Sequence, residues 1–255
     1  MQILLAEDNP VNQKVAVRML QRLGYEADIA MNGREAVEAL EKKQYDIILM
    51  DMQMPEMDGL EATKRIVATY PEGQRPHIIA LTANAMQGDR ERCLEAGMHD
   101  YISKHIRLED LTEAFGRYDG PRTVAEKVEE EEDSEGEPSV IDYAILQELI
   151  EMLGDDIDFA CGLIGDFLVD GAELVTNMRI SFESGNTTDL ARAAHTLKSS
   201  SATFGAMDAA ELAKQIEALA HEGAFSSETN QYLQKLEQLF PVVHRELEAY
   251  IMQHA

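Results

Sequence analysis

Apolar residues in the first 117 positions follow two patterns that alternate along the chain. Short, wholly apolar runs predict strands buried on both faces. The segments between them carry apolar residues at spacings of three and four, which predict amphipathic helices. Strands are expected at residues 2–6, 25–30, 46–50, 77–81 and 101–103. Helices are expected at residues 10–23, 33–43, 60–69, 88–96 and 108–117. This alternation predicts an α/β domain with a flavodoxin-like, doubly wound, five-stranded parallel sheet in the order 2-1-3-4-5.

Residues 140–255 show only the helical pattern. Glycines interrupt it at Gly154, Gly185, Gly205 and Gly223. One short helix is expected first, followed by longer helices at 157–183, 188–204, 207–221 and 227–252. Long antiparallel helices joined by short loops predict an all-α domain, a four-helix bundle.

The segment between these two parts, residues 119–139, has almost nothing apolar to bury and includes the acidic run Glu129–Glu132. Such a segment cannot offset its ordering entropy, so it is expected to be an extended, acidic, flexible linker. A flexible chain of about 20 residues spans on the order of 25 Å, which lets two domains touch or separate. The predicted domains are therefore 1–118 and 140–255.

Charge limits the partners that this chain is expected to have. It has 22 basic and 48 acidic residues, a net charge of −26, so nucleic acids and anionic membrane surfaces should repel it. No apolar run approaches the roughly 18 residues of a membrane span, and the chain starts with a strand rather than a signal peptide. Cys93 and Cys161 lie in no metal-binding spacing, which fits a reducing compartment. We expect a cytoplasmic protein, or the cytoplasmic end of a membrane-bound one.

Acidic residues follow two of the predicted strands. Glu7 and Asp8 follow the first strand and Asp51 follows the third. In the order 2-1-3-4-5 these strands are neighbours, so their carboxylates are expected to converge at one edge of the sheet. Crowded carboxylates repel one another unless a cation neutralises them, and Mg²⁺ is the expected ion. Thr82 and Lys104, at the ends of the fourth and fifth strands, should face the same place.

Asp51 beside Mg²⁺ can attack a phosphoryl group, because the metal and Lys104 offset the charge on the phosphoryl oxygens. The sequence thus predicts formation and hydrolysis of an aspartyl phosphate. Other interpretations stay open. An aspartate at a strand end also opens turns. A phosphatase of the haloacid dehalogenase type would have a second aspartate where Gln53 stands. The chain could also be a binding scaffold without catalytic chemistry.

Four motifs in this half occur in the order and spacing of a known family. They are Ala6-Glu7-Asp8-Asn9, the run from Leu49 to Gly59, Ala80-Leu81-Thr82-Ala83 and Ser103-Lys104. Over residues 1–117 the chain resembles the receiver domain of two-component response regulators. The resemblance implies that Asp51 accepts the phosphoryl group. It also implies that Asp8, Asp51 and the backbone carbonyl of Gln53 bind Mg²⁺, and that Glu7 acts through water.

By the same resemblance, Thr82 would hydrogen-bond to a phosphoryl oxygen, Lys104 would pair with that oxygen, and Tyr101 would be a rotating switch residue. The sequence departs from the family at one position. Receiver domains place a proline, usually after a cis bond, behind the lysine, whereas this chain has His105. A cis bond before a non-proline residue costs about 3 kcal/mol, so a trans Lys104–His105 bond or local strain is expected.

The helix expected at 188–204 carries a single histidine, His195. Helical spacing predicts a core stripe on this helix, made of Leu190, Ala194, Leu197, Ser201 and Phe204. His195 lies off that stripe, among small residues and one turn before Lys198, so an outward-facing imidazole is expected. Lys198 could steady a phosphoryl charge on the ring. A lone histidine on a helix is also often only structural.

The run from Ala194 to Ala206 is similar to the signature of histidine phosphotransfer (HPt) domains, which are four-helix bundles. The resemblance implies that His195 is phosphorylated and that Lys198 is its charge partner. Members of that family often have glycine where this chain has Ser199, which narrows the approach to the histidine.

Together the two halves predict a phosphorelay protein that exchanges one phosphoryl group between Asp51 and His195. The chain has no nucleotide-binding signature. It is therefore expected to be a phosphoryl carrier, either the C-terminal part of a hybrid sensor histidine kinase or a stand-alone relay protein. Its expected partners are an upstream sensor histidine kinase domain and a downstream response-regulator receiver domain. The sequence leaves open whether transfer occurs within one chain or between chains.

Overall fold

The computed structural model describes residues 1–82, 87–103, 108–118, 139–223 and 225–254. The predictions made for the linker, for Lys104 and for His105 lie outside the described residues. They stay predictions.

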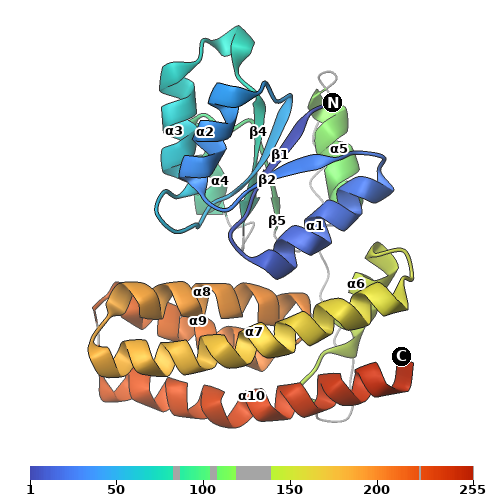
Figure 1. Cartoon of the computed structure of the whole chain (residues 1–255). Helices are drawn as coiled ribbons and strands as arrows, with labels where there is room; N and C mark the ends of the chain where they lie inside the picture. Colours follow the sequence, from blue (N-terminus) through green and yellow to red (C-terminus); the bar gives the residue numbers. More distant parts are fainter. Residues whose placement is uncertain (83–86, 104–107, 119–138, 224, 255) are drawn as a thin grey trace.

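Residues 3–118 form a parallel sheet with helices on both faces (Figure 1). The strands are β1 (Ile3–Ala6), β2 (Ala27–Ala30), β3 (Ile47–Asp51), β4 (His77–Thr82) and β5 (Asp100–Ser103). The helices are α1 (Pro10–Arg22), α2 (Gly33–Lys42), α3 (Gly59–Thr69), α4 (Gln87–Ala96) and α5 (Leu108–Tyr118), with a 3₁₀ turn, η1, at Glu72–Gln74. The strand order is β2-β1-β3-β4-β5 and all described pairs are parallel, so the predicted sheet is confirmed.

Alternate residues of the central strands pack against different helices. Leu5 and Leu49 belong to the apolar cluster that includes α1 and α5. Leu4 and Ile48 belong to the cluster of α2, α3 and α4 on the other face. Burial on both faces explains why these strands are continuous apolar runs in the sequence.

Residues 143–254 are all helical, apart from short connections. The helices are α6 (Tyr143–Met152), α7 (Ile157–Ser184), α8 (Thr187–Thr203), α9 (Met207–His221) and α10 (Ser227–His254). The four long helices pack as the predicted bundle, and α6 is the short helix before it. Aromatic rings fill its centre: Phe167 stacks on Phe204 at a centroid distance of 4.8 Å and meets Phe240 edge-on at 5.8 Å.

The two parts of the chain touch. Helix α1 lies along the bundle above α7, and its first turn lies beside α8 (Figure 1). The buried apolar side chains of α1 and of the bundle belong to one connected cluster. Because α1 directly follows β1, its first turn stands at the carboxyl edge of the sheet, and this edge therefore faces the bundle.

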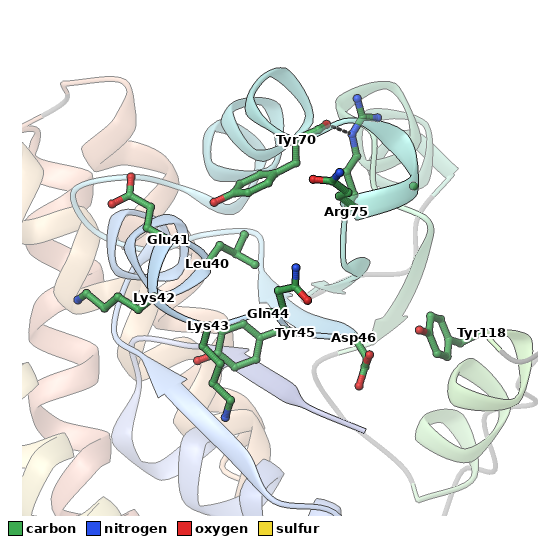
Figure 2. A pocket seen from close by; sticks show the side chains of 12 residues that line it. Leu40, Glu41, Lys42, Lys43, Gln44, Tyr45, Asp46, Tyr70, Arg75 and Tyr118 are labelled. Atoms are coloured by element: carbon green, nitrogen blue, oxygen red, sulfur yellow. Dashed lines mark hydrogen bonds between the residues drawn. The ribbon is translucent and has the colours of Figure 1, made fainter.

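A cavity of about 480 Å³ opens at the opposite edge of the sheet (Figure 2). Its walls are residues 40–46, which precede β3, together with Tyr70, residues 73–75 and Tyr118. Arg75 forms part of one wall and donates from Nε to the carbonyl of Tyr70 over 2.6 Å. This cavity lies at the amino ends of β3 and β4, so it is separate from the predicted acidic site.

Among the described residues, no helix is both long and apolar enough to cross a membrane.

Candidate functional site

Three carboxylates meet where β1 and β3 end. The parallel register pairs Ala6 with Met50, so the next residues, Glu7 after β1 and Asp51 at the end of β3, lie next to each other. Glu7, Asp8 and Asp51 each have one carboxylate oxygen within 4.8 Å of the others. Glu7 and Asp51 are almost fully buried, whereas Asp8 is partly exposed. The predicted convergence of these three side chains is thus what the structure has.

The donor set of this cluster fits a small divalent cation. Mg²⁺ prefers oxygen ligands at about 2.0–2.1 Å, so ligands on opposite sides of the ion are roughly 4 Å apart. The carboxylate oxygens of Glu7, Asp8 and Asp51 lie within 4.8 Å of one another, which is close to this spacing. Buried carboxylates so close together need a positive charge to stay ionised. The arrangement is therefore consistent with Mg²⁺ binding.

The loop after β3 holds Asp51 in place. The backbone N–H of Gln53 donates to Oδ1 of Asp51 over 3.0 Å. Helix α3 begins at Gly59, directly against the backbone of Asp51. A Cβ atom at position 59 would lie only 2.1 Å from the Asp51 carbonyl oxygen. Only glycine allows this close approach, so position 59 belongs to the site although it has no functional side chain.

Thr82 ends β4, one residue beyond Leu81, which pairs with Asp51. Thr82 is 2% exposed, and its Oγ1 has no hydrogen-bond partner among the residues that the structure describes. A buried hydroxyl normally has a partner, so this one can serve a ligand oxygen. Tyr101 lies in β5 opposite Ala80 and is half-buried against the cluster on the α3 side of the sheet. Its switch role stays a prediction.

The first turn of α1 supports Glu7, which the sequence did not reveal. The side-chain amide of Asn12 donates to Oε1 of Glu7 over 3.0 Å, and that of Gln13 donates to the Glu7 carbonyl over 2.5 Å. Asn9 caps the helix by accepting from the N–H of Val11 over 2.9 Å. Amide side chains clustered in the first turn of an otherwise amphipathic helix were the signal that could have indicated these contacts.

The prediction of an outward-facing His195 is wrong. The core stripe was correct, since Leu190, Ala194, Leu197, Ser201 and Phe204 are all fully buried. His195, however, is also buried, at 8% exposure. Helix α9 packs against one side of it, and the α/β domain contacts α8 at the neighbouring residues Thr196 and Ser199. The periodicity of one helix did not show that two other elements cover this face.

Glu217 on α9 is the principal partner of His195. Its Oε1 lies 2.7 Å from Nδ1 of His195, and its Oε2 accepts from Nζ of Lys198 over 2.6 Å. Burial alone raises the pKa of Glu217, but its interactions with His195 and Lys198 outweigh the effect of burial and lower the pKa to about 2. Glu217 is therefore ionised and holds both side chains.

Glu217 was not predicted from the sequence. It lies in a buried stripe of α9 that also contains Ala210, Ala213 and Ala220. A carboxylate within an apolar stripe was the available signal, because buried acids are rare unless they are paired.

The other ring nitrogen of His195, Nε2, differs from Nδ1 in its surroundings. Nε2 is buried and lacks a hydrogen-bond partner within the described part of the chain. With the proton on Nδ1, donated to Glu217, Nε2 keeps its lone pair. This nitrogen can therefore act as a nucleophile.

Asn12 connects the acidic cluster to the helix of His195. Its Nδ2 lies 3.0 Å from Oε1 of Glu7 and 2.9 Å from Oγ of Ser199, which stands one turn after His195. Nearby, Nδ2 of Asn9 lies 3.4 Å from the carbonyl of Thr196. The two groups predicted to carry a phosphoryl group therefore stand at one interface between the two parts of the chain.

Comparison with known families agrees with this division. Residues 3–116 match the response regulator receiver domain, and residues 162–253 match the Hpt domain. The chain joins a receiver domain to an Hpt domain. This combination supports a role in phosphorelay signalling. We refer to the two parts below as the receiver and the HPt bundle.

Several relatives are much longer proteins. Probable histidine kinase 1 of Oryza sativa subsp. indica is 43% identical over 150 residues, which is 47% of this chain and 16% of the relative. The aerobic respiration control sensor protein ArcB of Escherichia coli strain K12 is 32% identical over 152 residues, 60% of this chain and 19% of the relative. The chain thus spans less than a fifth of these two relatives.

Among solved structures, the chain is similar to the receiver domain of sensor histidine kinase PA1611 from Pseudomonas aeruginosa PAO1. The identity is 50%, the match covers 46% of this chain and 95% of that one, and the TM-score is 0.43.

Proposed function

We propose that the chain passes a phosphoryl group between Asp51 of the receiver and His195 of the HPt bundle. The bridge formed by Asn12, with Glu7 at 3.0 Å and Ser199 at 2.9 Å, is the observation that supports this most strongly. A transfer reaction needs its two reacting groups at one water-poor interface. The buried positions of Asp51 and His195 meet that need.

In the receiver, Asp51 is the phosphoryl acceptor. Glu7, Asp8, Asp51 and the carbonyl of Gln53 would hold Mg²⁺, Glu7 through water, and a bound Mg²⁺ supplies charge neutralisation for the phosphoryl oxygens. The hydroxyl of Thr82 hydrogen-bonds to one of those oxygens and Lys104 pairs with it. Tyr101 is proposed as the residue that reports the phosphorylated state.

In the HPt bundle, Nε2 of His195 is the nucleophile. Its lone pair forms the N–P bond while the O–P bond to Asp51 breaks, and the electron pair of that bond returns to the Asp51 carboxylate. The proton on Nδ1 stays where it is, because Glu217 accepts it at 2.7 Å. Lys198 offsets the added negative charge. The reverse transfer uses the same groups.

The chain has no nucleotide-binding signature, so its phosphoryl group must come from another domain. We assign that role to an upstream sensor histidine kinase domain, because two relatives are named histidine kinases or sensor proteins. The chain would then be the C-terminal part of a hybrid kinase and would deliver to a downstream receiver. Its two cysteines, Cys93 and Cys161, form no disulfide, which fits a cytoplasmic location.

The test is phosphorylation with acetyl phosphate and Mg²⁺, followed by intact-mass measurement. The Asp51→Asn variant should acquire no phosphoryl group. His195→Gln should carry one alkali-labile phosphoryl group, as an acyl phosphate does. Wild type should also acquire an acid-labile, alkali-stable group on His195. Asp46→Asn, at the other end of the same strand, should behave like wild type. A phosphoryl group on Asp51→Asn, or the absence of an acid-labile phosphoryl group on wild type, would overturn the proposal.

A further inference from the structure

Helix α1 carries its basic residues as one stripe. Lys14, Arg18 and Arg22 are spaced by four, so they lie on one side of the helix, and α1 contains no acidic residue. This is unusual in a chain whose net charge is −26. The three side chains are called the basic stripe below.

Each member of the basic stripe contacts the HPt bundle. Nζ of Lys14 lies 2.5 Å from Oδ2 of Asp166, and a guanidinium nitrogen of Arg18 lies 2.6 Å from Oδ2 of Asp156. Arg22 donates to the carbonyl of Glu151 over 2.9 Å and to that of Met152, in the last turn of α6. Carbonyls at a helix end carry partial negative charge, so all three contacts join opposite charges.

The order of these contacts fixes one orientation of the two helices. As the residue numbers rise along the basic stripe, those of the bundle fall, so α1 runs antiparallel to α7. The guanidinium of Arg18 also lies 5.3 Å from the ring centre of Phe159 on α7. The facing half of α7, residues 157–170, has three aspartates and no basic residue. Charge and geometry on the two surfaces therefore match each other.

We infer that the basic stripe is a docking surface for this chain's own HPt bundle, and that the docked form closes His195 to any second receiver. The inference rests on the proposed function, since it concerns access to the same histidine. In the docked form transfer breaks the O–P bond at Asp51 and forms the N–P bond at His195 within one chain.

The docked form excludes a competitor because it already occupies the surface next to His195. His195 is 8% exposed and its Nε2 is buried. A downstream receiver can reach Nε2 only after this chain's receiver has left, and it must then match the acidic face of α7. The expected partner is therefore a receiver domain with cationic side chains at the corresponding positions of its first helix.

The docked form is also reversible. The side chains of Lys14 and Asp166 are 49% and 47% exposed, and those of Arg18 and Asp156 are both 36% exposed. Ion pairs this exposed are individually weak and are screened by salt. The contact between the basic stripe and the HPt bundle can therefore open each time a phosphoryl group has been transferred.

The inference is tested with full chains mixed in pairs. The donor is His195→Gln, labelled on Asp51, and the acceptor is Asp51→Asn, which keeps His195 but covers it with its own receiver. Adding Lys14→Glu and Arg18→Glu to the acceptor should open it and raise the rate of label uptake at least about fivefold. The matched control, Lys14→Arg with Arg18→Lys, keeps both charges and should leave uptake unchanged.

Charge matching is tested on an acceptor opened by Lys14→Ala and Arg18→Ala, whose own position 14 cannot pair with a lysine at position 166. Adding Asp166→Lys to this acceptor should slow uptake from the donor with Lys14. A donor carrying Lys14→Glu should then restore the rate. Uptake that is no faster in the opened acceptor, or that ignores the charge on the donor, overturns the inference.

A second measurement does not depend on transfer. Modification of His195 by diethyl pyrocarbonate should be slow in wild type, and it should speed up in Lys14→Glu/Arg18→Glu or with added NaCl. His244, on α10, serves as the internal reference. If the wild-type chain transfers the phosphoryl group to His195, but the charge variants match the proteins without those substitutions in both assays, only this inference fails. If the wild-type chain never transfers a phosphoryl group to His195, the proposed function fails and the inference fails with it.

Discussion

Oε1 of Glu217 lies 2.7 Å from Nδ1 of His195, although the two residues belong to different helices. The same carboxylate accepts from Lys198 over 2.6 Å, so one buried anion holds both the imidazole and the ammonium group. A buried charge is tolerated only when it is paired in this way. In the tautomer with the ring proton on Nδ1, donated to Glu217, the lone pair of Nε2 is free for the proposed phosphorylation.

Glu217→Gln should slow phosphorylation of His195. The substitution keeps the size of the side chain but removes the charged acceptor. A hydrogen bond to a charged group contributes about 1.5–3 kcal/mol, which corresponds to roughly a tenfold to hundredfold loss in rate. Label transfer from Asp51 measures the rate, and nitrogen NMR of the ring measures which tautomer His195 adopts.

The control for this prediction is Glu211→Gln. Glu211 lies on the same helix, but it is exposed, and its hydrogen-bond partners among the described residues are Lys214 and Gln215. Its variant should transfer label like wild type. Equal rates in both variants, with an unchanged tautomer, would show that Glu217 does not position the ring.

The Thr82→Val substitution should stabilise the fold but slow the phosphorylation of Asp51. The Thr82 hydroxyl is buried and has no partner among the described residues, and an unsatisfied buried polar group is costly. Removing it should raise the free energy of unfolding by about 1 kcal/mol. The same change removes the proposed donor to a phosphoryl oxygen, so phosphorylation of Asp51 should slow about tenfold. Urea unfolding and intact mass after acetyl phosphate treatment measure the two effects.

Thr82→Ser keeps the hydroxyl and serves as the control for function. It should phosphorylate at nearly the wild-type rate while losing some stability through the missing methyl group. A Thr82→Val variant that is less stable than wild type, or fully active, would contradict the prediction.

The receiver fold and its acidic cluster could be predicted because both depend on local patterns. Continuous apolar runs identify strands that are buried on both faces. Once the strand order is known, the residues at the carboxyl ends of β1 and β3 must meet at one edge. The positions of Glu7, Asp8 and Asp51 thus follow from the sequence pattern alone.

The environment of His195 could not be predicted in the same way. The period of α8 gave the correct core stripe, but it describes only one helix. Burial of His195 depends on Glu217 of α9 and on the receiver, where Asn12 meets Ser199. These contacts join segments that are 22 and 187 residues apart in the chain, so helical spacing carries no information about them.

Gly59→Ala should impair Asp51 more than it impairs the fold. The new methyl group would stand 2.1 Å from the carbonyl oxygen of Asp51, so either the start of α3 or the end of β3 must move. Overpacking of this kind costs about 1–3 kcal/mol, and here the displaced residue is the proposed phosphoryl acceptor. We expect a strong loss of phosphorylation by acetyl phosphate, measured by intact mass.

Gly73→Ala is the matched control, because a Cβ at that position meets nothing within 4 Å. It should be phosphorylated as fast as wild type. Full phosphorylation of Gly59→Ala would show that the loop after Asp51 can shift without cost to the site.

The receiver should lose stability as the pH falls from 6.5 towards 4, because of His77. Burial, and then the neighbouring His99, lower the pKa of His77 to about 4, while Asp100 opposes the shift. Above pH 6.5 the folded and unfolded forms are both neutral at this position, so the native state is not penalised. Between pH 6.5 and 4 only the unfolded form takes up the proton, and unfolding becomes more favourable.

Hydrogen exchange of the β4 amides, followed by mass spectrometry from pH 7 to 4, measures this loss in the receiver separately from the bundle. His77→Phe keeps the ring that stacks on His99 at 4.6 Å but cannot bind a proton, so its stability should fall less steeply. His244→Gln changes a surface histidine on α10 and should keep the wild-type slope. The explanation is wrong if His77→Phe and wild type lose protection in parallel over the whole pH range.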